Sequence, residues 1–171
     1  MGPMKFTRIK KGTALFMILL AGAFLIMACG KKEESAGKDI SMEELEEKLL
    51  AADSTLPEMA VARGSDQDAE VTFAYLCGFD YDRVEDFFYA YADQGTAHEI
   101  SVIRLKDPMD AALVMKELKA HVESRLGTME NYSPDQVSLV EDHILLREGP
   151  YVALIICQKA GSVRSAFESF F

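Results

Sequence analysis

The sequence predicts an α+β fold, with an antiparallel or mixed sheet of about four strands in two hairpins. A long helix and a C-terminal helix are expected to pack on this sheet, and further helices are expected in the N-terminal part of the domain. Two observations lead to this prediction. Two pairs of short segments alternate with the two-residue period of β-strands, and a turn sequence joins the members of each pair. Between the pairs lies a long stretch with the period of an amphipathic helix.

The N-terminal part of the domain is predicted to hold two helices separated by a loop. Ser41 and Glu44 have the spacing of a capping box, which predicts a helix to about residue 52. Residues 56–65 include a proline and a glycine and are expected to form a loop. A second helix is expected over residues 68–76, stopped by Gly78, with three inward-facing side chains, those of Val71, Ala74 and Tyr75.

The first hairpin is predicted from an aromatic segment followed by an aliphatic one. Residues 84–92 are rich in phenylalanine and tyrosine, and residues 99–106 place Ile100 and Val102 on one face and Ile103 and Leu105 on the other. The sequence between them, DQGT at 93–96, is typical of a turn. The two segments therefore predict an antiparallel strand pair.

A long amphipathic helix is predicted to follow the first hairpin. Asp107 is expected to cap it, with Pro108 in the first turn, where the missing N–H does no harm. Its apolar face recurs every three or four residues, at Met115, Leu118, Val122, Leu126 and Met129. A second capping box, SPDQ at 133–136, predicts a short helix that includes Val137 and Val140.

The second hairpin is predicted over residues 143–147 and 151–158, around the turn at 148–150. Both faces of the last segment are apolar, because Val152, Leu154 and Ile156 alternate with other apolar residues. This pattern predicts a central strand that is covered on both sides. Ser162 is expected to cap a final helix.

The N-terminal residues predict a secretory signal. Four basic residues precede the uncharged apolar stretch 14–28, which is shorter than the roughly 20 residues of a membrane-spanning helix. The segment IMAC at 26–29 resembles the lipobox of bacterial lipoproteins, and this resemblance implies cleavage before Cys29 and a diacylglycerol on its thiol. The alternative is an uncleaved signal anchor with an incidental cysteine. Met4, directly before a lysine, is an alternative start.

These features divide the chain into a signal peptide at 1–28, a lipidated cysteine with a flexible tether at 29–40, and one α+β domain at 41–171. Residues 29–171 hold 14 basic and 28 acidic residues, for a formal net charge of −14. Such a surface repels nucleic acid and anionic lipid headgroups. Nucleic acid is therefore not an expected partner.

Two further cysteines, Cys77 and Cys157, lie in apolar segments of the expected domain. In an exported protein they could form a disulfide. Each could equally be a buried free thiol that behaves as a small apolar side chain. The sequence leaves both alternatives open.

The whole pattern resembles a group of small lipoproteins from Gram-positive, chiefly clostridia-like bacteria that share a domain of unknown function. The resemblance rests on the lipobox at Cys29 and on four segments, LCGFDY at 76–81, AHEISVIR at 97–104, NYSPDQ at 131–136 and GPYVALI at 149–155. It implies the same location and fold. Because that group has no established activity, it implies no catalytic residue.

Few residues have the spacing of a metal or catalytic site. His98, His121 and His143 are scattered and do not form a zinc-binding pattern. The acidic segments at 66–70 and 80–86 lack the glycine and glutamate of a calcium loop at its sixth and twelfth positions. Residues 30–171 contain no nucleophile elbow and no glycine-rich phosphate loop. We therefore expect no metal ligands and assign no catalytic residues.

The expected protein is a membrane-anchored lipoprotein on the extracytoplasmic face of the cell membrane. The leading interpretation is a non-enzymatic binding or accessory module of the cell envelope, with the membrane and an envelope protein as partners. No cofactor is expected besides the covalent lipid on Cys29. A solute-binding component of a transporter and a small envelope hydrolase are the alternatives. A hydrolase would be recognised by serine, histidine and acidic side chains that meet in one pocket.

Overall fold

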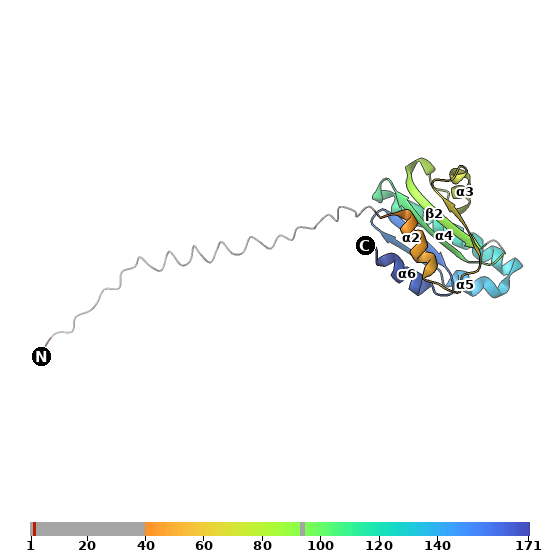
Figure 1. The fold of residues 1–171 in the computed structure, drawn as a ribbon. Helices are drawn as coiled ribbons and strands as arrows, with labels where there is room; N and C mark the ends of the chain where they lie inside the picture. Colours follow the sequence, from red (N-terminus) through yellow and green to blue (C-terminus); the bar gives the residue numbers. More distant parts are fainter. Residues whose placement is uncertain (1, 3–39, 93–94) are drawn as a thin grey trace. The chain divides into compact units, whose positions relative to one another are not determined.

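The five β-strands form one antiparallel sheet. A computed structural model describes residues 2, 40–92 and 95–171 (Figure 1). The strands lie in the order β1-β2-β3-β5-β4, and every neighbouring pair is antiparallel. Their bounds are β1 Met59–Arg63, β2 Val84–Ala92, β3 Glu99–Leu105, β4 Ile144–Glu148 and β5 Tyr151–Ile156. The predicted α+β class and both predicted hairpins, β2–β3 and β4–β5, are confirmed.

The sheet has one strand more than the sequence predicted. β1 lies within residues 56–65, which were expected to be a loop. Its sequence MAVAR has a single β-branched residue, Val61, and three small or flexible side chains, so its own preference for a strand is weak. Pairing with β2 determines its conformation, with Val61 opposite Ala90. The pairing with β2, a strand distant in the sequence, therefore gives this segment a strand conformation that its own residues favour only weakly.

The described helices occupy the segments between and around the strands. The α-helices are α2 Met42–Ala51, α3 Ala69–Leu76, α4 Ala111–Tyr132, α5 Val137–Glu141 and α6 Ala160–Glu168. Three short 3-10 turns complete the described part, η1 Tyr81–Arg83, η2 Pro108–Asp110 and η3 Pro134–Gln136. No helix among the described residues is both long enough and apolar enough to cross a membrane.

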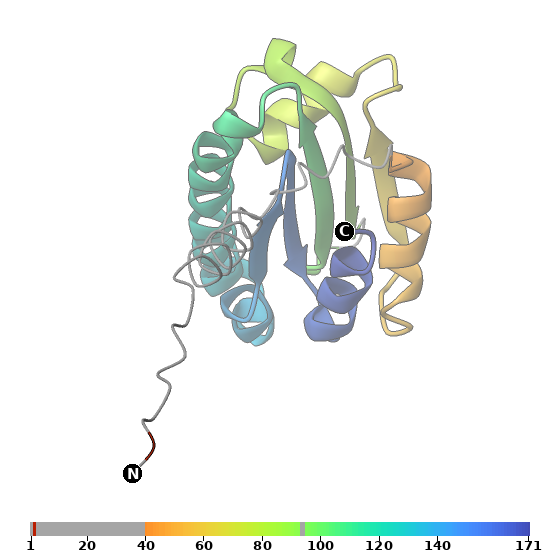
Figure 2. The ribbon, with the colours of Figure 1, turned by 90° about the vertical axis from the view of Figure 1, so that its left-hand side faces the viewer.

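The helices lie on both faces of the sheet, so the domain has three layers. Figure 2 shows α4 and α5 on one side of the strands and α2 and α6 on the other. β5 is buried along its whole length between β3 and β4, which confirms the prediction of a central strand covered on both sides.

The first layer packs α3, α4 and α5 on the face of the sheet that includes Phe87 and Leu154. α4 contributes Val114, Leu118 and Val122, all nearly inaccessible to solvent. Burial of each such side chain contributes about 1.5–3 kcal/mol relative to an exposed one. The apolar face predicted for the long helix is confirmed.

The second layer consists of α2 and α6, the first and last described helices. Leu45 and Leu49 of α2 and Val163 and Phe167 of α6 are fully buried against the opposite face of the sheet, around Phe88. α2 also packs directly on α6. This face of the sheet is thus covered by two elements from the two ends of the domain.

α3 has the predicted range but a different inward face. Its buried residues are Ala69, Phe73 and Leu76, whereas Val71 and Tyr75 are 61% and 77% exposed, and Ala74 is also exposed. The Phe73 ring decides the orientation, because it packs 5.2 Å from the Phe87 ring and 5.4 Å from the Tyr81 ring. Such aromatic contacts stabilise beyond the area they bury.

Two of the four predicted helix caps are confirmed, and Ser133, which precedes η3, makes no capping hydrogen bond with its side chain. Ser41 accepts a hydrogen bond from Glu44 N–H at 3.3 Å, and Asp107 accepts one from Met109 N–H at 2.8 Å. Ser162, the expected cap of the last helix, is instead inside α6, which begins at Ala160. The Asp53 carboxylate binds the backbone N–H of Lys159, directly before α6. A cap from a distant residue is not visible in the local sequence.

Candidate functional site

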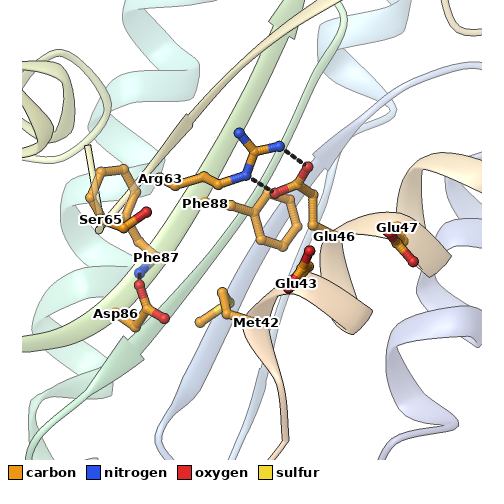
Figure 3. A pocket seen from close by; sticks show the side chains of 9 residues that line it. All are labelled: Met42, Glu43, Glu46, Glu47, Arg63, Ser65, Asp86, Phe87 and Phe88. Carbon is orange, nitrogen blue, oxygen red and sulfur yellow. Dashed lines mark hydrogen bonds and ion pairs between the residues drawn. The ribbon is translucent and has the colours of Figure 1, made fainter.

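A cavity of about 350 Å³ lies between the N-terminal turns of α2 and the adjoining ends of β1 and β2 (Figure 3). We call it the α2 pocket. Five of its lining residues are charged, one is a serine and three are apolar: Met42, Glu43, Glu46, Glu47, Arg63, Ser65, Asp86, Phe87 and Phe88. Four carboxylates and one guanidinium therefore face a single cavity.

The α2 residues of the pocket share one side of the helix because they are three and four positions apart. Leu45 and Leu49, on the adjoining side of α2, are buried in the core. Glu43 and Glu47 are exposed at the rim, whereas Glu46 is only 6% exposed. The packing of the helix thus forces one carboxylate below the surface.

Arg63, the last residue of β1, pairs with this buried carboxylate. Its Nε donates to Glu46 Oε2 at 2.7 Å and its Nη2 donates to Oε1 at 2.5 Å. The bidentate pair is visible in Figure 3, where the guanidinium extends across from the strand to the helix. The hydrogen bond to Glu46 raises the pKa of Arg63, although burial opposes this shift. The guanidinium and the carboxylate form a charge-assisted pair that joins α2 to β1, an edge strand of the sheet.

Asp86 reaches the pocket because the register of β2 shifts between Val84 and Asp86. Its Oδ1 accepts a hydrogen bond from Phe87 N–H at 2.8 Å. Gly64 lies directly beside this carboxylate, and a Cβ on that residue would clash with Oδ1. Strand irregularities of this kind often redirect a side chain near a functional site.

A second polar cluster is buried between α4 and the sheet. The Glu99 side chain is only 3% exposed, and His121 Nε2 lies 2.7 Å from its Oε2. Arg125 Nε lies 2.6 Å from Oε1, as an ion pair whose angle is too poor for a hydrogen bond. The pKa of Tyr89 is raised mainly by burial and, to a smaller extent, by the negative charge of nearby Glu99. A carboxylate is thus held inside the apolar layer by two side chains of one helix.

A third cluster joins the end of α2 to the start of α6. Asp53 accepts hydrogen bonds from the backbone N–H groups of Thr55 at 2.8 Å and Lys159 at 2.9 Å, and from Cys157 Sγ. Burial would raise the pKa of Asp53, but these bonds and the Thr55 hydroxyl together lower it to about 2. His98 lies nearby, with its Nδ1 3.1 Å from Thr96 Oγ1.

The chemistry of this third cluster is that of a protected thiol. Burial, the hydrogen bond to Asp53 and the charge of that carboxylate raise the pKa of Cys157 to about 12. The nucleophilic form of cysteine is the thiolate, which this environment disfavours. Burial also lowers the pKa of His98, although Asp53 opposes this shift. The cysteine, histidine and aspartate types found in some hydrolases are present here, but the thiol is kept protonated.

The two cysteines of the domain are both buried and both free in the structure. Cys77 belongs to the layer with α3 and α4, and Cys157 belongs to the layer with α2 and α6. The sheet therefore lies between them. Burial raises the pKa of Cys77 to about 11. Cys29, the predicted lipidation site, lies outside the described residues.

The three histidines lie at separate places in the domain. His98 and His121 belong to the two different clusters, and His143 Nδ1 lies 2.9 Å from the Val140 carbonyl oxygen. Within residues 40–92 and 95–171, no three histidine, cysteine or acidic side chains are grouped as metal ligands. Ser101 Oγ, next to Glu99 on the same strand face, has no hydrogen-bond partner in the described part and does not line the α2 pocket.

The sequence did not identify Glu46 and Arg63 as members of one site. Glu46 belongs to an acidic run that appears solvated, and Arg63 was assigned to a loop. MAVAR, four apolar residues followed by Arg63, is too short and too poor in β-branched residues to have revealed β1 or the direction of this arginine. Asp86 was noted only as part of an acidic segment.

One comparison with known proteins gives a match. The family described as "Domain of unknown function (DUF4358)" matches residues 61–157, from within β1 to the residue after β5. The matched stretch includes α3, α4 and α5 but neither α2 nor α6. No curated protein and no solved structure matches the chain at a significant level. Because the matched stretch covers more than half of the 171 residues, the chain belongs to the DUF4358 family.

Proposed function

We propose that the protein is a membrane-tethered accessory module of the cell envelope, which binds an envelope partner without catalysing a reaction. The proposal includes a diacylglycerol on Cys29 and a location on the extracytoplasmic face of the cell membrane of a Gram-positive, clostridia-like bacterium. One observation carries it. The basic residues, the apolar stretch 14–28 and Cys29 follow one another in the order of a lipoprotein signal.

The spacing between the anchor and the domain supports this proposal. Eleven residues, 29–39, precede the first described residue of the domain, Ile40. A chain of that length spans at most about 40 Å. The anchor would therefore keep the domain close to the bilayer, where a lipid with two acyl chains provides stable attachment.

The charge of the domain supports a binding role. Residues 40–171 hold 25 acidic and 11 basic residues. This surplus favours basic partners and speeds their encounter with the domain at low salt. The α2 pocket is one place where the surplus faces a cavity rather than open solvent.

The anchor is tested with Cys29→Ser in the full chain. Wild type should incorporate a clickable fatty acid, enter the detergent phase and sediment with membranes, because its thiol is acylated. The variant should lose all three properties. Cys77→Ala, which removes a thiol from the domain, is the matched control and should behave as wild type. Equal fatty-acid incorporation by Cys29→Ser, or none by wild type, would refute the anchor.

The binding role is tested by crosslinking in living cells, followed by purification of the full chain. One envelope protein should be recovered reproducibly with wild type and lost when the surface carboxylates of the α2 pocket are neutralised. Recovery of abundant lipoproteins alone, in the same amounts from both forms, would argue against an accessory module.

The α2 pocket also favours a second candidate, a solute-binding component of a transporter. Its volume of about 350 Å³ is at the lower end of the range for small-ligand sites. A ligand that binds only the folded state raises the apparent stability. A thermal-shift screen of amino acids, sugars and polyamines should then give at least one stabilising solute, and a screen without any would exclude this candidate.

A further inference from the structure

The two partners of the Arg63–Glu46 pair differ widely in solvent exposure. The Glu46 side chain is 8% exposed and lies under the helix that carries it, whereas the Arg63 side chain is 48% exposed. The carboxylate is thus a fixed part of the α2 pocket. The guanidinium can turn toward solvent without unpacking the core. Within the α2 pocket, the protein therefore presents a fixed acceptor occupied by a movable cation.

Within the described residues, Glu43, Glu47 and Asp86 form no ion pair with a lysine or arginine. Glu43, Glu47 and Asp86 line the same cavity, and Arg63 is already paired with Glu46. The basic residue of α2, Lys48, donates instead to Ser169 Oγ at 2.8 Å, and its Nζ lies 4.7 Å from the centre of the Phe170 ring. The lining keeps a surplus of three negative charges in a partly enclosed space, where water screens charges less than at an open surface.

The shape of the pocket fits a cation on an aliphatic stem. Met42 and Phe88 provide an apolar wall beside the carboxylates. Lysine and arginine side chains bury their methylene groups along such walls while the charged end meets polar groups. Arg63 already shows this arrangement, because its stem passes the Phe88 ring on the way to Glu46 (Figure 3).

We propose that the α2 pocket binds a lysine or arginine side chain of an envelope protein, and that Arg63 is a resident cation that competes with it for Glu46. The proposal rests on the accessory function proposed above and names the chemistry of its partner. The incoming cation binds between Glu43 and Asp86, and it gains Glu46 when Arg63 turns outward. Arg63 thereby keeps the buried carboxylate paired in the unbound protein, since an unpaired buried charge is costly.

The test uses the ¹⁵N-labelled full chain in detergent micelles at constant ionic strength. The probes are the N-acetyl methylamides of lysine and arginine, with that of norleucine as the uncharged control of equal stem length. The amide signals of Phe87 and Gly64, beside the Asp86 carboxylate, should shift and saturate with the two charged probes in the millimolar range. Equal shifts with the norleucine probe would overturn the proposal.

Variants then locate the site. Glu43→Gln with Asp86→Asn should raise the Kd of the lysine probe about fivefold, as expected for two partly exposed charges. Glu123→Gln with Glu130→Gln removes the same charge from the exposed side of α4 and should leave the Kd unchanged. An equal effect of both double variants would show attraction to the overall charge only, and would overturn the pocket assignment.

The role of Arg63 has its own test. Arg63→Gln should lower the Kd of the arginine probe about three- to tenfold, because Glu46 loses its resident partner. A higher Kd would mean that Arg63 supports the ligand instead of competing with it. If this variant does not fold, the carboxamide variants still decide the site. If the probes do not bind but Cys29 is acylated, the pocket assignment is rejected and the anchor stands. If the probes bind but Cys29 is not acylated, the anchor is rejected and the pocket assignment stands.

Discussion

The Asp53 carboxylate binds the backbone N–H of Lys159 at 2.9 Å, although the two residues are 106 positions apart. This bond joins a residue two positions after α2 to the residue directly before α6. Lys159 Nζ adds a second link, to Ser54 Oγ at 2.8 Å. Side chains that bind the first turn of a helix contribute about 1 kcal/mol each in favourable cases. The two outer helices are thus fixed to each other by polar contacts as well as by packing.

The first prediction concerns Asp53 and acid. Since the pKa of this carboxyl is lowered to about 2, its ionised form is favoured by folding. Its contribution is complete above about pH 4 and is lost as the pH falls through 2. Asp53→Asn should lower the free energy of unfolding at pH 7 by about 1–2 kcal/mol and flatten its decline between pH 4 and 2. Urea titrations across this range measure both effects, and an unchanged acid decline would contradict the prediction.

The second prediction concerns His98, whose pKa is lowered by burial. The unfolded chain then binds a proton more readily than the folded one. Stability should therefore decrease as the pH falls below the ordinary histidine value of about 6.5. His98→Phe should reduce this decrease between pH 7 and 5, because phenylalanine has no titratable group. The variant also loses the contact between His98 Nδ1 and Thr96 Oγ1, which affects stability at every pH. His143→Phe, at a half-buried position, is the comparison variant.

The third prediction concerns the buried Glu99 cluster. Arg125→Met removes the arginine partner from a carboxylate that is almost fully buried, and should cost about 3 kcal/mol. Arg125→Met with Glu99→Met should cost less than the sum of the single changes, since the double change leaves no unpaired charge there. A double-mutant cycle measured by chemical denaturation gives the coupling energy. Additive effects would show that the pair does not interact.

The fourth prediction compares two glycines. Gly64→Ala should destabilise the protein by about 1–2 kcal/mol and displace Asp86, because the new methyl group clashes with Oδ1. Gly127 lies inside α4 with open space around its would-be Cβ. Gly127→Ala should stabilise the protein by about 0.5–1 kcal/mol through the higher helix preference of alanine. Thermal unfolding should therefore move in opposite directions for these two variants.

The elements with strong local patterns were predictable from the sequence, and those that depend on distant partners were not. The apolar residues of α4 recur every three or four positions over a long stretch, which indicates a helix. Those of β5 occupy both faces of the segment, which indicates a central strand. β1 required β2 as a partner, and the start of α6 required Asp53. The inward face of α3 was mispredicted because this helix has large apolar or aromatic side chains on both faces. Phe73 is buried in the core, whereas Val71 and Tyr75 are exposed.

The candidate site was even less visible in the sequence. Its charged pair joins α2 to a strand that was not predicted, across 17 positions. Acidic residues on a helix are normally solvated, so no single residue of the run suggested that Glu46 is buried. Only the packing of α2 on the sheet distinguishes that glutamate from its neighbours.

The pairing of α2 with α6 also determines when the domain can be completed. During synthesis, α2 emerges first, but the helix it packs against is formed by nearly the last residues of the chain. Until those residues are released, Leu45 and Leu49 have only part of their final surroundings. Contacts between such distant segments are slow to form, because closing a long loop costs entropy before the contact is gained. The part of this sheet face that α6 covers therefore stays open until residues 160–168 have emerged, and a chain interrupted shortly before residue 160 would leave it exposed.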